Sequence, residues 1–270
     1  GRDISTTRLG LASTRIIGCC AIGGEAVGIA AALCNKYACD PRELAPHVKE
    51  LQQLILKEDG FLPGFKNEDE KDLALKAKIT ASSWEQGGEP EKVANGISRK
   101  LGEEQNGWVT KPGECLIMKW DETKEIREIR LTFESNFAYP IRVTMAPLRQ
   151  AQQRNGVPEE LVKDVKIELY REGKKTGEAF VKDNYQRLCS VGIGDVPADE
   201  IRVIPESTNG AEQAVIHEIR VYQNNIFLPV MQSRQVIERQ EYYYENIDIN
   251  RNLWQCFLDT ENVLFLRAGN

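Results

Sequence analysis

The apolar and polar positions along the chain separate a helical beginning from a longer region of alternating residues. Residues 16–34 contain one charged side chain, Glu25, and their small residues recur at helical spacing, which predicts a helix with a small-residue face. A second stripe of helical period begins after Pro46 and ends near Gly60. We therefore expect the chain to begin with helices.

The charged segment at 65–72 separates this beginning from short runs in which apolar and polar residues alternate. Alternation with period two predicts strands with one buried face. We expect a linker at 65–72 and, over 73–225, an antiparallel β-sandwich of about eight strands that folds as its own domain. Residues 226–270 fit neither period and form an extension whose structure is not predicted. The expected strands include 115–120, 126–131, 141–145, 165–169, 201–204 and 215–222.

Composition and charge exclude several classes of protein. Of the 270 residues, 41 are acidic and 35 basic, so the net charge is −6 and a nucleic-acid partner is not expected. The sequence contains two histidines, His47 and His217, too few for a histidine cluster. The nearest match to a dinucleotide fingerprint, at 192–197, lacks its last glycine, so no complete dinucleotide-binding fold is predicted.

The apolar helix at 16–34 has three interpretations. It is long enough to span a membrane, but Glu25 at its centre costs about 2.5–3.5 kcal/mol on insertion scales, so we expect no span. The second interpretation is a core helix without a further function. In the third, Gly23 and Gly24 stand at the helix start, where bare amides and a partial positive charge bind an anionic or carbonyl group of a ligand.

The seven cysteines include no C-x-x-C motif, which argues against a zinc ribbon. Cys19 and Cys20 fall in the apolar helix, where we interpret them as small buried side chains. Cys34 and Cys39 lie on either side of the expected helix end. They leave two alternatives open, a contact between the two thiols or two separate residues.

The N-terminal residues contain several blocks in a fixed order: GRDISTT at 1–7, STRII at 13–17, AIGGEAVG at 21–28, AAA at 30–32, PREL at 41–44 and FLPG at 61–64. In this order they resemble the C-terminal end of bacterial FAD-dependent oxidoreductases of the xanthan-lyase-associated type. The resemblance implies that residues 1–64 are the helical remnant of a FAD-binding domain, with Arg15, Gly23 and Gly24 against the cofactor. It assigns no catalytic residue, because Arg8 stands where the family pattern has a histidine.

A second set of blocks lies in the region of strands: ITASSW at 79–84, VANG at 93–96, GWV at 107–109 and HEIRVY at 217–222. These blocks are similar to a discoidin, or galactose-binding-like, jelly roll. Trp108 and Trp120 are expected to fill its core. Trp84 lies near a loop, where it either packs or stacks on a sugar face, and Tyr139 is a second loop aromatic.

The second resemblance also implies a structural calcium ion near a turn and a late glutamate. In this chain the corresponding residues are Asn95 and Glu218, which offer the oxygen ligands that Ca²⁺ prefers. Asn95 replaces an aspartate of the family pattern and removes one negative charge. A sandwich that needs no metal is the alternative.

Together these features predict a mainly β protein, in which a galactose-binding-like sandwich follows a helical remnant of a FAD-binding domain. We expect a fragment of a FAD-dependent oxidoreductase: the parent binds FAD, whereas this chain alone carries no flavin and is inactive. The sandwich would be an accessory module for a saccharide ligand, and the resemblance implies a periplasmic or secreted protein. The alternative is a non-enzymatic carbohydrate-binding or interaction module.

Overall fold

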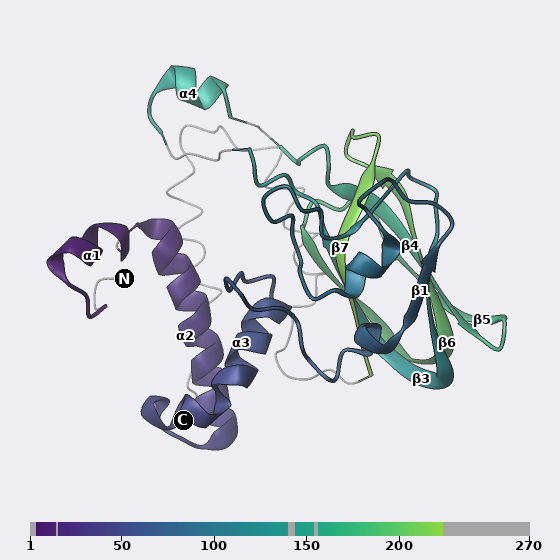
Figure 1. The fold of residues 1–270 in the computed structure, drawn as a ribbon, viewed down its shortest axis with the longest axis horizontal. Coiled ribbons are helices and arrows are strands. Elements are labelled where there is room, and N and C mark those ends of the chain that lie inside the picture. The colour runs from purple at the N-terminus through teal and green to yellow at the C-terminus, as the bar shows by residue number, and fades with distance from the viewer. Residues whose placement is uncertain (1–3, 15, 140–143, 154–155, 224–270) are drawn as a thin grey trace, which may run out of the picture. The chain divides into compact units, whose positions relative to one another are not determined.

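The computed structural model describes residues 4–14, 16–139, 144–153 and 156–223. Contacts divide the chain into two units, Gly1–Asn225 and Ile226–Asn270. The expected extension at 226–270 lies outside the described residues. The described part belongs to the first unit, in which helices come first and strands follow (Figure 1).

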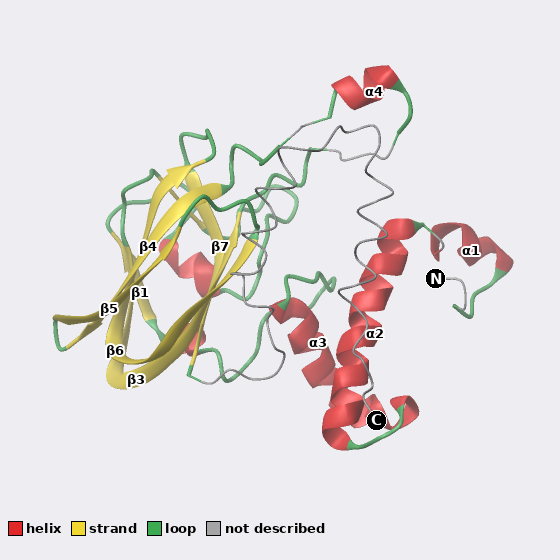
Figure 2. Ribbon diagram, turned by 180° about the vertical axis from the view of Figure 1, so that it is seen from behind, coloured by secondary structure: helices red, strands yellow, loops and turns green. Residues whose placement is uncertain are grey.

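The first unit begins with helices, as the apolar pattern predicted. They are α1 (Arg8–Thr14), α2 (Ile17–Tyr37), the 3-10 helix η1 (Pro41–His47) and α3 (Val48–Lys57). Helices α2 and α3 pack side by side in both views (Figures 1 and 2). Glu50 joins them, because its carboxylate accepts hydrogen bonds from Lys36 Nζ at 2.7 Å and from the Tyr37 hydroxyl at 2.6 Å.

Helix α2 is apolar, yet little of it is covered. Its buried residues are Ile29 and Leu33, whereas Ile17, Ile22 and Val27 are 65–68% exposed. Among the described helices, α2 is long and apolar enough to cross a membrane by length and composition, a test that a core helix also passes. The described residues therefore leave most of its apolar surface uncovered.

Seven strands form one antiparallel sheet in the described part of the chain, with the order β2-β7-β3-β6-β4-β5 and β1 paired to β3. Their bounds are β1 (Lys78–Ala81), β2 (Trp108–Thr110), β3 (Leu116–Phe133), β4 (Val162–Arg171), β5 (Lys174–Val181), β6 (Leu188–Thr208) and β7 (Ala214–Tyr222). Short helices lie between them: η2 (Leu73–Lys76), η3 (Pro90–Ala94) and α4 (Pro147–Ala151). The predicted mainly β, antiparallel fold is confirmed (Figure 2).

The long strands β3 and β6 connect the parts of the sheet, which enclose one core. The first part of β3 pairs with β1 and its last part with β7, and β6 runs beside both parts. Register shifts after Lys119 and after Ile126 let β3 bend between the two parts. Apolar side chains from both parts therefore enter a single cluster, which also takes in β4, β6 and β7.

Two tryptophans lie in this core as the sequence predicted. Trp108 is fully buried and donates from Nε1 to the Ser83 carbonyl at 2.9 Å. Trp120 is 6% exposed and donates to the Leu73 carbonyl at 2.9 Å. Each indole thus fills the core and satisfies its one polar group.

Some strands differ from the expectation. The runs at 115–120 and 126–131 belong to one bent strand, β3, because Lys124 and Glu125 between them also pair with β6. Strand β5 was not expected, since it is polar and exposed and is held by its pairing with β4. Of the run expected at 141–145, residues 141–143 lie outside the described part, and Thr144 and Met145 form no strand.

The segment expected as a linker, 65–72, contains buried residues. Asn67 and Asp72 are 4% and 1% exposed, and Asp72 Oδ1 accepts a hydrogen bond from the Val221 amide of β7 at 2.9 Å. The Asn67 amide donates to the Gly96 carbonyl at 2.9 Å. Charge alone made this segment look solvated, whereas Asp72 is bound to β7 and Asn67 to the loop after η3.

Candidate functional site

The cofactor-binding residues expected on the first helix occupy different positions from those predicted. Helix α2 begins at Ile17, so Gly23 and Gly24 lie in its second turn and not at its start. Their amides belong to the hydrogen-bonded part of the helix and are not free to bind an anion. Both glycines are exposed, with open space where a Cβ would stand. They fit the close approach of a flat group to the helix, but not the predicted role of amide donors. Arg15 lies outside the described residues.

Two aromatic side chains expected in loops are partly exposed. Trp84 follows β1 and is 50% exposed, and Tyr139 is 47% exposed. The tryptophan thus offers half of its surface to solvent, unlike the two core tryptophans.

The two residues expected to bind calcium have partners within the chain. The Asn95 side chain accepts from the Ile97 amide at 2.8 Å and donates to Asn106 Oδ1 at 2.8 Å. Glu218 is 3% exposed and accepts from Arg220 Nε at 2.8 Å. Its second oxygen, Oε1, is buried without a hydrogen-bond partner, but a cation bound there would lie beside the Arg220 guanidinium.

These contacts do not fit the predicted calcium site. The positive charge beside Glu218 is already supplied by an arginine of the chain. Within the described ranges, no group of three or more acidic, histidine or cysteine side chains is arranged to hold a metal ion.

A charged and buried patch lies where β3 and β7 face the end of α3. Both strands carry the tripeptide Glu-Ile-Arg, which ends at Arg130 in β3 and at Arg220 in β7. Strand pairing places these two arginines directly opposite each other. Their side chains and those of Glu128 and Glu218 are 3–5% exposed. Like charges opposed on a sheet cost free energy unless other groups compensate them.

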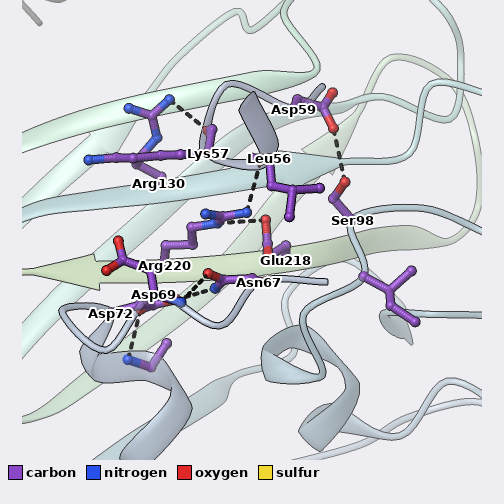
Figure 3. A network of polar contacts seen from close by, with 12 residues as sticks. Leu56, Lys57, Asp59, Asn67, Asp69, Asp72, Ser98, Arg130, Glu218 and Arg220 are labelled. Carbon is purple, nitrogen blue, oxygen red and sulfur yellow. Dashed lines mark hydrogen bonds and ion pairs between the residues drawn. The ribbon is translucent and has the colours of Figure 1, made fainter. Parts of the chain in front are cut away.

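The end of α3 supplies part of the compensation (Figure 3). Arg130 Nη2 donates to the carbonyl of Lys57 at 3.0 Å, and Arg220 Nη2 donates to the carbonyl of Leu56 at 2.9 Å. The last carbonyls of a helix have no partner within it and carry partial negative charge. Each guanidinium group therefore donates one hydrogen bond to a carbonyl at the end of the helix.

Asp59 follows α3 and has a left-handed backbone conformation (φ 61°). It binds two further arginines, Arg99 and Arg187. Its Oδ2 accepts from Arg187 Nε at 2.7 Å. Its Oδ1 and its carbonyl accept from Arg99 Nη2 at 3.1 Å and 2.7 Å. Arg187 also donates to the carbonyls of Phe133 and Ser98. We call Arg99, Arg130, Arg187 and Arg220 the arginine clamp, because all four bind the segment 56–59.

The charged side chains next to the arginine clamp are paired with groups of opposite charge. Lys57 is 7% exposed, and its Nζ lies 3.9 Å from Glu128 Oε2 and 4.0 Å from the ring centroid of Tyr222. Burial lowers the pKa of Lys57, although Glu128 opposes this shift. Burial disfavours the charged form of Arg220, but the adjacent Glu218 outweighs it and raises the pKa. The patch therefore consists of paired, buried charges that join α3 to the sheet.

Sequence reasoning missed the clamp. The alternating pattern predicted one buried face for each strand, and in such a pattern a buried arginine on the other face looks like an exposed one. A usable signal was present: Glu-Ile-Arg occurs at 125–127 and 128–130 in β3 and at 218–220 in β7, and residues two apart lie on the same face of a strand.

The solved structures that the fold resembles include carbohydrate-binding domains. A fucose-binding module of Streptococcus pneumoniae is 13% identical, with a TM-score of 0.42, and the match covers 58% of this chain and 99% of that module. The family 32 module of C. perfringens NanJ, solved with galactose, is 16% identical, with a TM-score of 0.40 and coverage of 56% and 97%. The family 32 module of S. pneumoniae EndoD is 13% identical, with a TM-score of 0.43 and coverage of 57% and 99%.

No curated protein matches the chain. The family model described as FAD dependent oxidoreductase matches residues 1–55, which include α1, α2, η1 and most of α3. The resemblance predicted from the sequence blocks is thereby confirmed for this segment. Over residues 1–55 the chain is therefore similar to part of a FAD dependent oxidoreductase.

Proposed function

We propose that the chain is a fragment of a FAD-dependent oxidoreductase in which α2 packs against the flavin-binding domain and the β-domain is an accessory module. The observation that carries the proposal is the apolar surface of α2 within the matched segment. Ile17, Ile22 and Val27 are each about two-thirds exposed in this chain, although burying such a side chain stabilises a protein by roughly 1.5–3 kcal/mol. A flavin-binding domain would cover them.

In the parent protein FAD would supply the redox chemistry. This chain would contribute a surface that positions the flavin. Gly23 and Gly24 present backbone without side chains on the exposed surface of α2, and a flat ring system can approach such a surface closely. Arg15 stays a predicted cofactor-binding residue on the family resemblance alone.

The proposal is tested by the flavin content of the longer protein in which this chain occurs. We expect Ile22→Glu to lower the FAD bound per protein, because a charge would enter the covered face of α2. The matched control is Phe180→Glu in β5, where the aromatic side chain is also half-exposed but lies far along the chain from the matched segment. Equal flavin content in both variants would contradict the packing of α2 against the flavin domain.

The accessory module would bind a saccharide weakly at a loop end, in the periplasm or outside the cell. Sugar recognition needs a flat apolar surface beside hydrogen-bonding groups, and Trp84 exposes half of its indole in a loop. One stacking residue contributes at most a few kcal/mol, so we expect a Kd on the order of 0.1–1 mM.

NMR titration of the chain with mono- and oligosaccharides tests the sugar site. The expected result is a set of shifts around Trp84 that disappears in Trp84→Ala. Shifts that survive this substitution unchanged would place the ligand elsewhere. If no sugar binds while the flavin experiment succeeds, the β-domain has a purely structural role.

A further inference from the structure

The end of α2 brings two cysteines together. Ala38, directly after the helix, has a left-handed backbone conformation (φ 50°). Its amide donates to the Asn35 carbonyl at 3.3 Å, and the amide of Cys39 donates to the Cys34 carbonyl at 3.0 Å. This pair of hydrogen bonds defines a Schellman motif, in which the residue after the left-handed position returns to the last turn of the helix.

In a Schellman motif the two residues joined by the outer hydrogen bond commonly make a side-chain contact, and both are usually apolar. Here both are cysteines. The backbone hydrogen bond holds the two residues side by side, and burial, together with the neighbouring Cys34, raises the pKa of the Cys39 thiol. Both cysteines are free and partly accessible to solvent. The helix end therefore holds a preformed pair of thiols that a small reagent can reach.

The other described cysteines lack this arrangement. Cys19 and Cys20 are adjacent in α2, where a bond between neighbours is strained. Cys115 and Cys189 lie in the β-domain, and burial raises the pKa of Cys189 to about 12, which keeps it protonated.

We propose that Cys34 and Cys39 form a redox-active dithiol, which a low-molecular-weight disulfide oxidises to an intramolecular disulfide. A thiolate of the pair attacks the reagent, forms a mixed disulfide and releases one reduced thiol. The second thiolate of the pair attacks the mixed disulfide and releases the other reduced thiol. The pair loses two electrons and two protons, and one molecule of the reagent is reduced to two thiols.

The site is tested by peptide mapping of the 270-residue chain after incubation with glutathione disulfide at pH 8.5 and alkylation of the remaining thiols. Trypsin cleaves after Lys36, which separates residues 16–36 from residues 37–42. We expect the two peptides to remain joined before reduction and to separate after it. The joined mass should be lower by 2 Da than the sum of peptide 37–42 with a free thiol and peptide 16–36 alkylated only at Cys19 and Cys20.

Two variants identify the partner of Cys39, because the peptide 16–36 also holds Cys19 and Cys20. The joined peptide should disappear in Cys34→Ser and persist in the double variant Cys19→Ser, Cys20→Ser. Two separate peptides that each carry alkylated or glutathionylated cysteines would overturn the proposal. A joined peptide that survives in Cys34→Ser would overturn it as well.

Discussion

The carboxylate of Glu134, directly after β3, binds several neighbouring groups. His217 Nε2 lies 3.1 Å from Oε2, and the amides of Ser135 and Asn136 donate to Oε1. Burial raises the pKa of Glu134, but the contacts with His217 and the two amides outweigh it and lower the pKa to about 2.

This shift predicts a pH dependence of stability. Because the folded-state pKa is depressed below the ordinary value of 4.5, the stabilisation is present above pH 4.5 and is lost as the pH falls toward 2. Its size is on the order of 3 kcal/mol. Urea unfolding between pH 3 and pH 7 should show a flatter pH dependence for Glu134→Gln than for the unchanged chain. Parallel curves would show that Glu134 contributes nothing to the acid sensitivity.

Two glycines with similar backbone angles test the close contact at residue 67. Gly96 (φ +86°) and Gly87 (φ +81°) both lie in the left-handed region, where a side chain is strained. A Cβ on Gly96 would stand 2.8 Å from the carbonyl oxygen of Asn67, whereas one on Gly87 would meet nothing within 4 Å.

We expect Gly87→Ala to cost about 1–2 kcal/mol through backbone strain alone. Gly96→Ala should cost a further 1–3 kcal/mol, roughly, because backbone atoms must move to make room. Chemical unfolding of both variants measures the difference. Equal costs would mean that the 65–72 segment yields without strain.

At the scale of elements, the arginine clamp determines how α3 meets the sheet. Arg130→Met would leave the Lys57 carbonyl and Glu128 without their guanidinium partner. Breaking one partner of a buried charge pair costs about 3–5 kcal/mol. On the same strand Arg127 is 45% exposed and forms an ion pair with Asp195 at 3.6 Å, so it provides a matched control.

We expect Arg127→Met to change the free energy of unfolding by about 1 kcal/mol or less. Hydrogen exchange adds a local readout: in Arg130→Met the amides near the end of α3 should exchange faster than in Arg127→Met. The same exchange rate in both variants would show that the clamp does not hold the helix end.

The sequence predicted those elements in which burial of one apolar face determines the pattern of residues. Alternating apolar residues predicted β4, β7 and both parts of β3, because one face of each enters the core. The helix over 16–34 and the buried Trp108 and Trp120 were likewise predictable. The position of Gly23 and Gly24 was not, because the start of α2 at Ile17 carries no capping side chain in the sequence. The burial of the Glu218–Arg220 pair was also hidden, since it depends on strand pairing and on the contact with the end of α3.

At the scale of the whole first unit, residues 56–72 bind side chains and backbone of the sheet. A chain that begins at residue 73 would lose these contacts. A chain of 73–225 would lack the carbonyls that bind Arg130 and Arg220, and also Asp59, the partner of Arg99 and Arg187. It would also lack Asp72, which binds the end of β7.

We therefore expect 73–225 to unfold at a lower denaturant concentration, and less cooperatively, than 1–225. Urea unfolding followed by tryptophan fluorescence reports on Trp108 and Trp120 in both chains. Equal midpoints and equal slopes would support an independent sandwich joined by a simple linker, as the sequence alone predicted.

The arginine clamp also has a consequence for binding by a linked module. A module on a flexible tether raises the local concentration of its ligand over a range of distances and orientations. A module bound through buried charge pairs to the preceding helix samples few orientations. Its effective concentration is therefore high for one geometry of an extended ligand and close to zero for others. If the β-domain binds a saccharide, the spacing between that sugar and a group bound at the N-terminal segment would be selected by the protein and not averaged by a linker.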